Sequence, residues 1–286
     1  MNTGRDLMKR LLHLLPVQSI KDEYHLTGNA EAIIENLTNN QTQTNLRNFI
    51  FRHSSITRQN VYIFELNKNF YRQGFNAANF PFTVENPRTE QGQFVFHCLP
   101  RTIYHVYLSN PVITDELHFL HPVTVKITNR TLIIHFTKLV KNISHYYPED
   151  RVARKSKQEN TEEEILSRIK QFFAAYNPQA LDINVGVKHL WDIDDVDCYK
   201  IQWRRQFSSA TEVMDGTLTF KERYPNDYQQ IIQTPLVKTV FKCLRTDDYL
   251  CKEFTTDPEN GLISTNQFAD NINQVSNVIS TILTNN

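Results

Sequence analysis

The spacing of apolar residues changes near residue 61, and this change constrains the fold more than any other feature of the sequence. Before it, apolar side chains recur every three or four residues, as in Met8, Leu11 and Leu15, which would share one side of a helix. After it, polarity alternates within short runs, as in Val123–Ile127, a pattern typical of a strand with one solvated face. The order of the two patterns predicts helices followed by an antiparallel sheet, and therefore an α+β fold.

The first sixty residues read as a small helical module. Within residues 19–37 a turn at Gly28 separates two short helical segments, and the second carries Ile33, Ile34 and Leu37 at helical spacing. Residues 46–53 suggest one further helix with an apolar face.

The segment 19–37 resembles the helix-extension-helix modules of the SAP and Rho N-terminal type. The positions that carry the resemblance are apolar or turn residues: Ile20, Leu26, Gly28, Ile33, Ile34 and Leu37. The resemblance implies a helical unit that contacts DNA or RNA, with Lys21 and His25 as contacts to phosphate. A module that docks a protein partner is the alternative, because apolar periodicity predicts a packed face without identifying what covers it.

A β-rich region follows from about residue 61. Aromatic and β-branched residues fill 61–66, 94–99 and 103–108, and 123–127 forms a hairpin with 131–136 across a turn at 128–130. The stretch 67–93 contains Gly74, Pro81, Pro87 and Gly92 and reads as irregular loops. These strands predict an antiparallel meander.

The second half of the chain predicts a mixture of helices and strands. Thr161 and Glu164 form the pattern of a capping box, which starts a helix whose apolar face includes Ile165 and Ile169. Further on we expect helices over 187–191, 227–232 and 267–283 and strands over 199–207, 217–221 and 236–244. The predicted organisation is a helical module over 1–60, an antiparallel β-rich region over 61–147, a charged linker or loop over 148–160 and an α+β region over 161–286.

Composition bounds the classes of function. Lys plus Arg and Asp plus Glu number 31 each, so nucleic-acid binding would need a local patch of positive charge rather than a whole-molecule field. The four cysteines lack C-x-x-C spacing, and no apolar run is long enough for a membrane span. We expect an intracellular protein, cytoplasmic or nuclear, that does not contact a membrane.

Motifs of familiar enzymes are absent from the sequence. No G-x-G-x-x-G, G-x-x-x-x-G-K-[ST], G-x-S-x-G or H-E-x-x-H pattern occurs, which favours a protein that is not an enzyme and holds no cofactor or metal. The acidic run 192–197 lacks the glycine and late glutamate of a calcium loop, which favours a solvated connector. A histidine group on the predicted sheet leaves a metal-dependent enzyme as an alternative: His97, His105, His118, His121 and His135.

Local positive charge supplies the favoured hypothesis, a nucleic-acid-binding subunit of a larger complex, with DNA favoured over RNA. Cations gather in the predicted loop 148–160, and Trp203 lies among basic residues on a predicted strand, where it would stack on a base. The alternative for this tryptophan is a core position with its neighbours on the opposite face. A structural subunit that binds only proteins is the second hypothesis. The candidate contacts are Lys21, His25, Arg151, Arg154, Lys155, Lys157, Trp203, Arg204 and Arg205.

Overall fold

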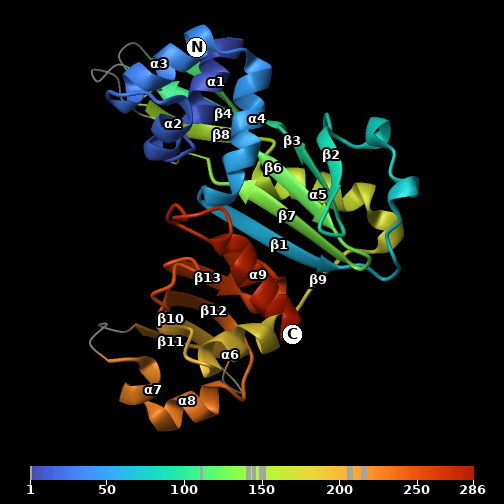
Figure 1. Ribbon diagram of the computed structural model, residues 1–286, viewed down its shortest axis with the longest axis vertical. Coiled ribbons are helices and arrows are strands. Elements are labelled where there is room, and N and C mark those ends of the chain that lie inside the picture. Colours follow the sequence, from blue (N-terminus) through green and yellow to red (C-terminus); the bar gives the residue numbers. More distant parts are fainter. Residues whose placement is uncertain are drawn as a thin grey trace. The chain divides into compact units, whose positions relative to one another are not determined.

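The structure is a computed structural model that describes residues 2–109, 112–139, 143, 146–147, 153–204, 209–213 and 218–286. At 153–157, 204 and 209–213 the description covers the backbone. The fold is α+β, with antiparallel sheets, as the sequence predicts (Figure 1). The helices are α1 (Gly4–Leu12), α2 (Val17–Tyr24), α3 (Ala30–Asn40), α4 (Gln43–His53), α5 (Glu162–Phe172), α6 (Asn184–Asp192), α7 (Phe220–Arg223), α8 (Pro225–Ile231) and α9 (Gln274–Thr284).

Most strands lie between α4 and α5 or after α6. They are β1 (Gln59–Glu65), β2 (Glu85–Glu90), β3 (Gln93–Cys98), β4 (Arg101–Leu108), β5 (Ile113–Leu120), β6 (Val123–Ile127), β7 (Thr131–Thr137), β8 (Ala153–Glu159), β9 (Gln179–Ala180), β10 (Val196–Arg204), β11 (Ser209–Val213), β12 (Leu236–Cys243), β13 (Glu253–Asp257) and β14 (Leu262–Ser264). The chain divides into two compact units, each built from three separate segments. The first unit comprises 1–54, 70–128 and 136–177, and the second comprises 55–69, 129–135 and 178–286.

Helices α1 to α4 of the first unit confirm the helical start that the sequence predicts. Each helix except α2 begins at a polar cap: the Thr3, Asn29 and Thr42 side chains accept backbone N–H bonds of the first turn. Gly28 adopts a φ of 125° between α2 and α3, a backbone conformation that residues with a Cβ atom rarely adopt. The apolar faces of the four helices form one core, so the periodicity reports burial correctly.

Two small antiparallel groups of strands complete the first unit, in the orders β6-β3-β2 and β5-β4-β8. Strands β2, β5 and β8 were not predicted. Strand β2 lies in the predicted irregular stretch 67–93, and β8 lies in the predicted linker 148–160, where it pairs with β4. Both expectations were wrong because these strands are polar; five of the six residues of β2 are exposed, so no apolar alternation marks it.

The stretch 67–93 is anchored by phenylalanines. Phe75 and Phe80 each pack their rings within about 5 Å of Phe96 on β3, with centroid distances of 5.0 and 4.9 Å, and both also contact Phe172 of α5. Aromatic pairs of this kind stabilise a loop without regular hydrogen bonding. Glycine and proline therefore predicted the irregular backbone correctly between β1 and β2, while the buried rings fix it in place.

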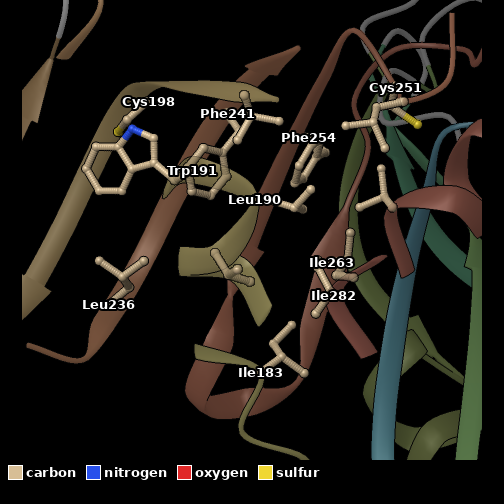
Figure 2. Close-up of a cluster of buried hydrophobic side chains, with 14 of the residues drawn as sticks. Ile183, Leu190, Trp191, Cys198, Leu236, Phe241, Cys251, Phe254, Ile263 and Ile282 are labelled. Carbon is tan, nitrogen blue, oxygen red and sulfur yellow. The ribbon is translucent and has the colours of Figure 1, made fainter. Parts of the chain in front are cut away.

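The second unit is built on a sheet with the strand order β11-β10-β12-β13-β14-β1-β7, and β9 pairs with β1. Its core lies between this sheet and helices α6 and α9. Figure 2 shows Trp191 of α6 beside Phe241 of β12, with Leu190 and Ile282 from the two helices near Phe254 and Ile263. The ring centroids of Trp191 and Phe241 are 6.1 Å apart. Burial of these side chains supplies the main favourable free energy for this unit.

Several boundaries in the second unit differ from the sequence expectations. The predicted strand 217–221 is wrong over its described part, since Thr219 forms a capping box with Glu222 and starts helix α7. Helix α9 begins at Gln274 rather than near residue 267. Strands β13 and β14 were missed because neither shows alternating polarity: β13 has a single large apolar residue, Phe254, and β14 has only three residues.

Candidate nucleic-acid interface

Strands β10 and β12 divide their side chains between the core and an exposed face. Ile201 and Phe241 are fully buried, whereas Lys200, Lys238 and Lys242 are exposed. In the antiparallel register Lys200 lies opposite Val240, the residue midway between the two β12 lysines. Directly opposed residues share a face of the sheet, and diagonal neighbours lie about 7–8 Å apart. The three lysines therefore lie together on one side of the sheet.

A tyrosine joins this group at a β-bulge. The register shifts between Cys198 and Lys200, which leaves Tyr199 without a regular partner on β12. Its side chain is 37% exposed, and the Lys242 ammonium nitrogen lies 4.5 Å from the centroid of its ring. This cation–π contact orients the ring while leaving part of it open to solvent. We call Tyr199, Lys200, Lys238 and Lys242 the basic sheet face.

The acidic neighbours of the basic sheet face lie at one end of it. Asp197 and Glu253 both lie opposite Lys242 in the strand register. Burial raises the pKa of the Asp197 carboxyl, which accepts the backbone N–H of Phe220 at 3.0 Å. Among the side chains that the structure describes, none forms an ion pair with Lys200 or Lys238. The positive charge of this face is therefore concentrated at these two residues.

The tryptophan predicted to stack on a base is in the core instead. Trp203 of β10 is 7% exposed and belongs to the same hydrophobic cluster as Trp191, so the core alternative is the one that the structure shows. Arg204 has its backbone in β10, opposite Ser209, and its side chain lies outside the description, as does all of Arg205. Tyr199 takes the place of Trp203 as the exposed aromatic residue of this strand.

The predicted contacts of the helical module lie on α2 and its C-terminal end. Lys21 is half-buried on α2, and His25 is the exposed residue that ends this helix with a φ of 52°. Three cations elsewhere on the module are paired with carboxylates. Arg5 and Lys9 both contact Glu35, and Arg52 pairs with Glu23 at 2.6 Å. Exposed pairs of this kind leave little net positive field for a phosphate backbone.

Three of the remaining predicted cations belong to strand β8 rather than to a loop. The backbones of Arg154, Lys155 and Lys157 pair with Tyr107, Val106 and His105 of β4. Their side chains lie outside the description, and so does Arg151 as a whole. These residues are in the first unit with Lys21 and His25, whereas Trp203 and Arg204 are in the second.

The five histidines do not form one group. His135 is in the second unit, where its Nδ1 lies 2.9 Å from the Gln59 Oε1, and the others are in the first. Burial, helped by Arg88 and Lys126, lowers the pKa of His97 to about 3, and its ring stacks on Phe51.

Histidine, cysteine and carboxylate side chains are the usual protein ligands of metal ions. Within the described residues, no three or more of them are grouped so that they could hold a metal ion. All four cysteines are free, and burial raises the pKa of Cys251 to about 12, which suits an inert thiol.

The acidic run between α6 and β10 is engaged within the second unit. Asp192 accepts the Tyr228 hydroxyl at 2.9 Å, Asp194 pairs with Lys221 at 2.6 Å, and Asp195 pairs with Arg245 at 3.1 Å. These contacts tie α7, α8 and the residues after β12 to one short connection. The run therefore has a structural role that the expectation of a solvated connector did not include.

Comparison with known protein families and with curated proteins finds no match to this chain. Over the residues that the structure describes, every helix is too short or too polar to cross a bilayer. The arguments about function therefore depend on the residues themselves.

Proposed function

We propose that this protein binds single-stranded nucleic acid across the basic sheet face of its second unit, and that it acts as a binding subunit rather than as an enzyme. The observation that carries the proposal is the presence of three exposed lysines and one exposed tyrosine on adjacent strands, with Lys200 and Lys238 lacking carboxylate partners among the described side chains. Cations that track a backbone, together with an aromatic ring for a base, are the elements that single strands require.

The geometry favours a single strand over a duplex. Recognition of a duplex groove usually uses a helix or a two-stranded ribbon that enters the groove. The basic sheet face lies on the surface of strands β10 and β12, which belong to a wider sheet. Unstacked bases can lie against such a surface, with Tyr199 contacting one base and the lysine ammonium groups contacting phosphates on either side.

Fluorescence anisotropy with a labelled deoxythymidine oligonucleotide of about 15 nucleotides tests the proposal. We expect binding at about 50 mM salt that weakens as salt rises, because each neutralised phosphate releases counterions. The double variant Lys200→Gln/Lys238→Gln should lower the slope of log K against log salt by about 1.4, since each single-strand contact contributes about 0.7. Tyr199→Ala should weaken binding by roughly tenfold with a small change in slope.

A matched control uses two other lysines of the second unit. Lys188 lies on α6, and Lys252 pairs with Asp270 at 3.0 Å. The double variant Lys188→Gln/Lys252→Gln removes the same charge, so it should leave affinity and slope close to those of the parent protein. Absence of binding at low salt, or an equal loss in both double variants, would contradict the proposal. Duplex DNA and single-stranded RNA of matched length show whether the face prefers single strands and DNA.

A further inference from the structure

A cavity of about 420 Å³ lies in the first unit. Its walls come from separate elements: Arg47 from α4, Glu85 from β2, Arg101 from β4 and Leu120 from β5. The segment before β2 adds Phe82 to the lining. The volume is within the range of about 300–1,000 Å³ that small-molecule sites occupy.

The lining combines polar and apolar groups, as a site for an amphiphilic ligand does. Phe82, Leu99 and Leu120 supply apolar surface, and Leu120 is 8% exposed. Two arginines face one glutamate among the charged lining residues, so the cavity carries a positive balance. Arg101 is exposed, and its guanidinium has no hydrogen-bond or ion-pair partner among the side chains that the structure describes.

Arg47 is the most informative residue of the cavity. A single contact of 3.3 Å joins its Nη1 to the Glu85 Oε1, which is a long and one-sided pair for a guanidinium that can bind a carboxylate through two parallel bonds. Its Nε is buried and has no hydrogen-bond partner in the described part of the chain. A buried donor without an acceptor costs free energy, so the pair with Glu85 leaves this guanidinium incompletely satisfied.

The rim of the cavity is fixed by α5. Arg168 donates from its Nη2 to the Pro81 carbonyl oxygen at 3.2 Å, and its guanidinium lies 4.4 Å from the centroid of the Phe82 ring. One face of Phe82 is thereby held against an arginine, which orients the ring that lines the cavity. The apolar wall is therefore formed before any ligand arrives.

We propose that this cavity binds a small organic anion, with its acidic group at Arg47 and Arg101 and its apolar body against Phe82, Leu99 and Leu120. The acidic group is a carboxylate or a phosphate ester, which guanidinium groups bind by the same charge-assisted hydrogen bonds. Glu85 competes with the ligand for Arg47 and so limits affinity.

Isothermal titration of the full chain with benzoate, phenyl phosphate, benzyl alcohol and benzylamine tests this assignment. Both anions should bind more tightly than the neutral and cationic compounds, and the ratio of the two anion affinities identifies the preferred acidic group. Arg101→Gln should weaken anion binding by about tenfold. Glu85→Gln should strengthen it by about threefold or more, because a competing carboxylate is removed.

Arg72→Gln is the matched control, since Arg72 is an exposed arginine of the same unit that bonds Thr89 outside the cavity. Its anion affinity should equal that of the parent protein, and circular dichroism should give each variant the same spectrum. No anion binding at about 10 mM, or benzylamine binding as tightly as benzoate, would overturn the assignment. Weaker binding by Glu85→Gln would also overturn it, because Glu85 would then be a contact to a positive group of the ligand.

Discussion

Gly186→Ala should destabilise the second unit even though alanine favours helices. Gly186 lies in α6, where a Cβ atom would come within 2.0 Å of the Ile282 carbonyl oxygen and 2.7 Å of its carbon in α9. Carbon and oxygen atoms avoid such distances, so the two helices would have to separate by about 1 Å, the gap between the 2.0 Å contact and the 3.0 Å lower limit of real Cβ contacts. The obstacle is backbone, which cannot rotate away as a side chain can.

Two opposing contributions determine how much Gly186→Ala changes the free energy of unfolding. Replacing glycine by alanine inside a helix contributes about 1 kcal/mol of stability. Overpacking a well-filled core costs about 1–3 kcal/mol and sometimes more, and a clash with backbone belongs at the upper end of that range. We therefore expect a net loss of about 2 kcal/mol in the free energy of unfolding.

Urea denaturation followed by tryptophan fluorescence measures this loss directly. The chain has two tryptophans, Trp191 and Trp203, and both are buried in the core of the second unit. Their emission therefore reports on the unit that contains Gly186. Val185→Ala, at a position that is 64% exposed on the same helix, is the control and should change stability by about 0.5 kcal/mol or less. A Gly186→Ala protein as stable as the parent would refute the close packing of α6 against α9.

Two further predictions concern the first unit, whose helix content makes circular dichroism the suitable probe. Burial lowers the pKa of His97 to about 3 and that of His121 to about 4 in the folded protein. In the unfolded chain a histidine has a pKa of about 6.5, so below that pH the unfolded chain binds more protons than the folded protein does. The free energy of unfolding should therefore be highest above pH 6.5 and should be lower by about 2 kcal/mol per histidine at pH 5. A urea midpoint that does not change between pH 7.5 and pH 5 would contradict this prediction. Arg10 is 4% exposed, donates to the His118 carbonyl oxygen at 2.6 Å and lies over the Phe119 ring. Arg10→Met should lower stability by about 2 kcal/mol because it leaves that oxygen unpaired, and a melting temperature equal to that of the parent would show that the contact is dispensable.

The helices of the first sixty residues could be predicted from the sequence because the buried residues there recur with the period of a helix. Ile33, Ile34 and Leu37 of α3, for example, are buried residues at the spacing that a helix requires. The polar strands β2 and β8 could not be predicted in the same way. The β8 residues pair with β4 through backbone groups, and a strand of charged side chains carries no signal in a single sequence.

The basic sheet face could be predicted only in part. Lys200 was noticeable as a cation close to Trp203, but Lys238 and Lys242 are far from it in sequence. What brings them together is the register of β10 against β12, including the bulge after Cys198. Register depends on which strands meet, and one sequence does not contain that information. Alternation along residues 238–242 was the available signal, since Thr239 and Phe241 are buried while Lys238 and Lys242 are exposed.

The pairing of β1 with β14 has a consequence for how the protein is made. Tyr62 pairs with Leu262, so the two partners are about 200 residues apart, a length that a ribosome translates in about 10–40 s. During that interval residues 60–62 of β1, which later pair with β14, lack this partner, although the strand carries the apolar residues Val61, Ile63 and Phe64. Slowing translation, or withholding chaperones during synthesis, should therefore reduce the yield of folded second unit more than that of the first.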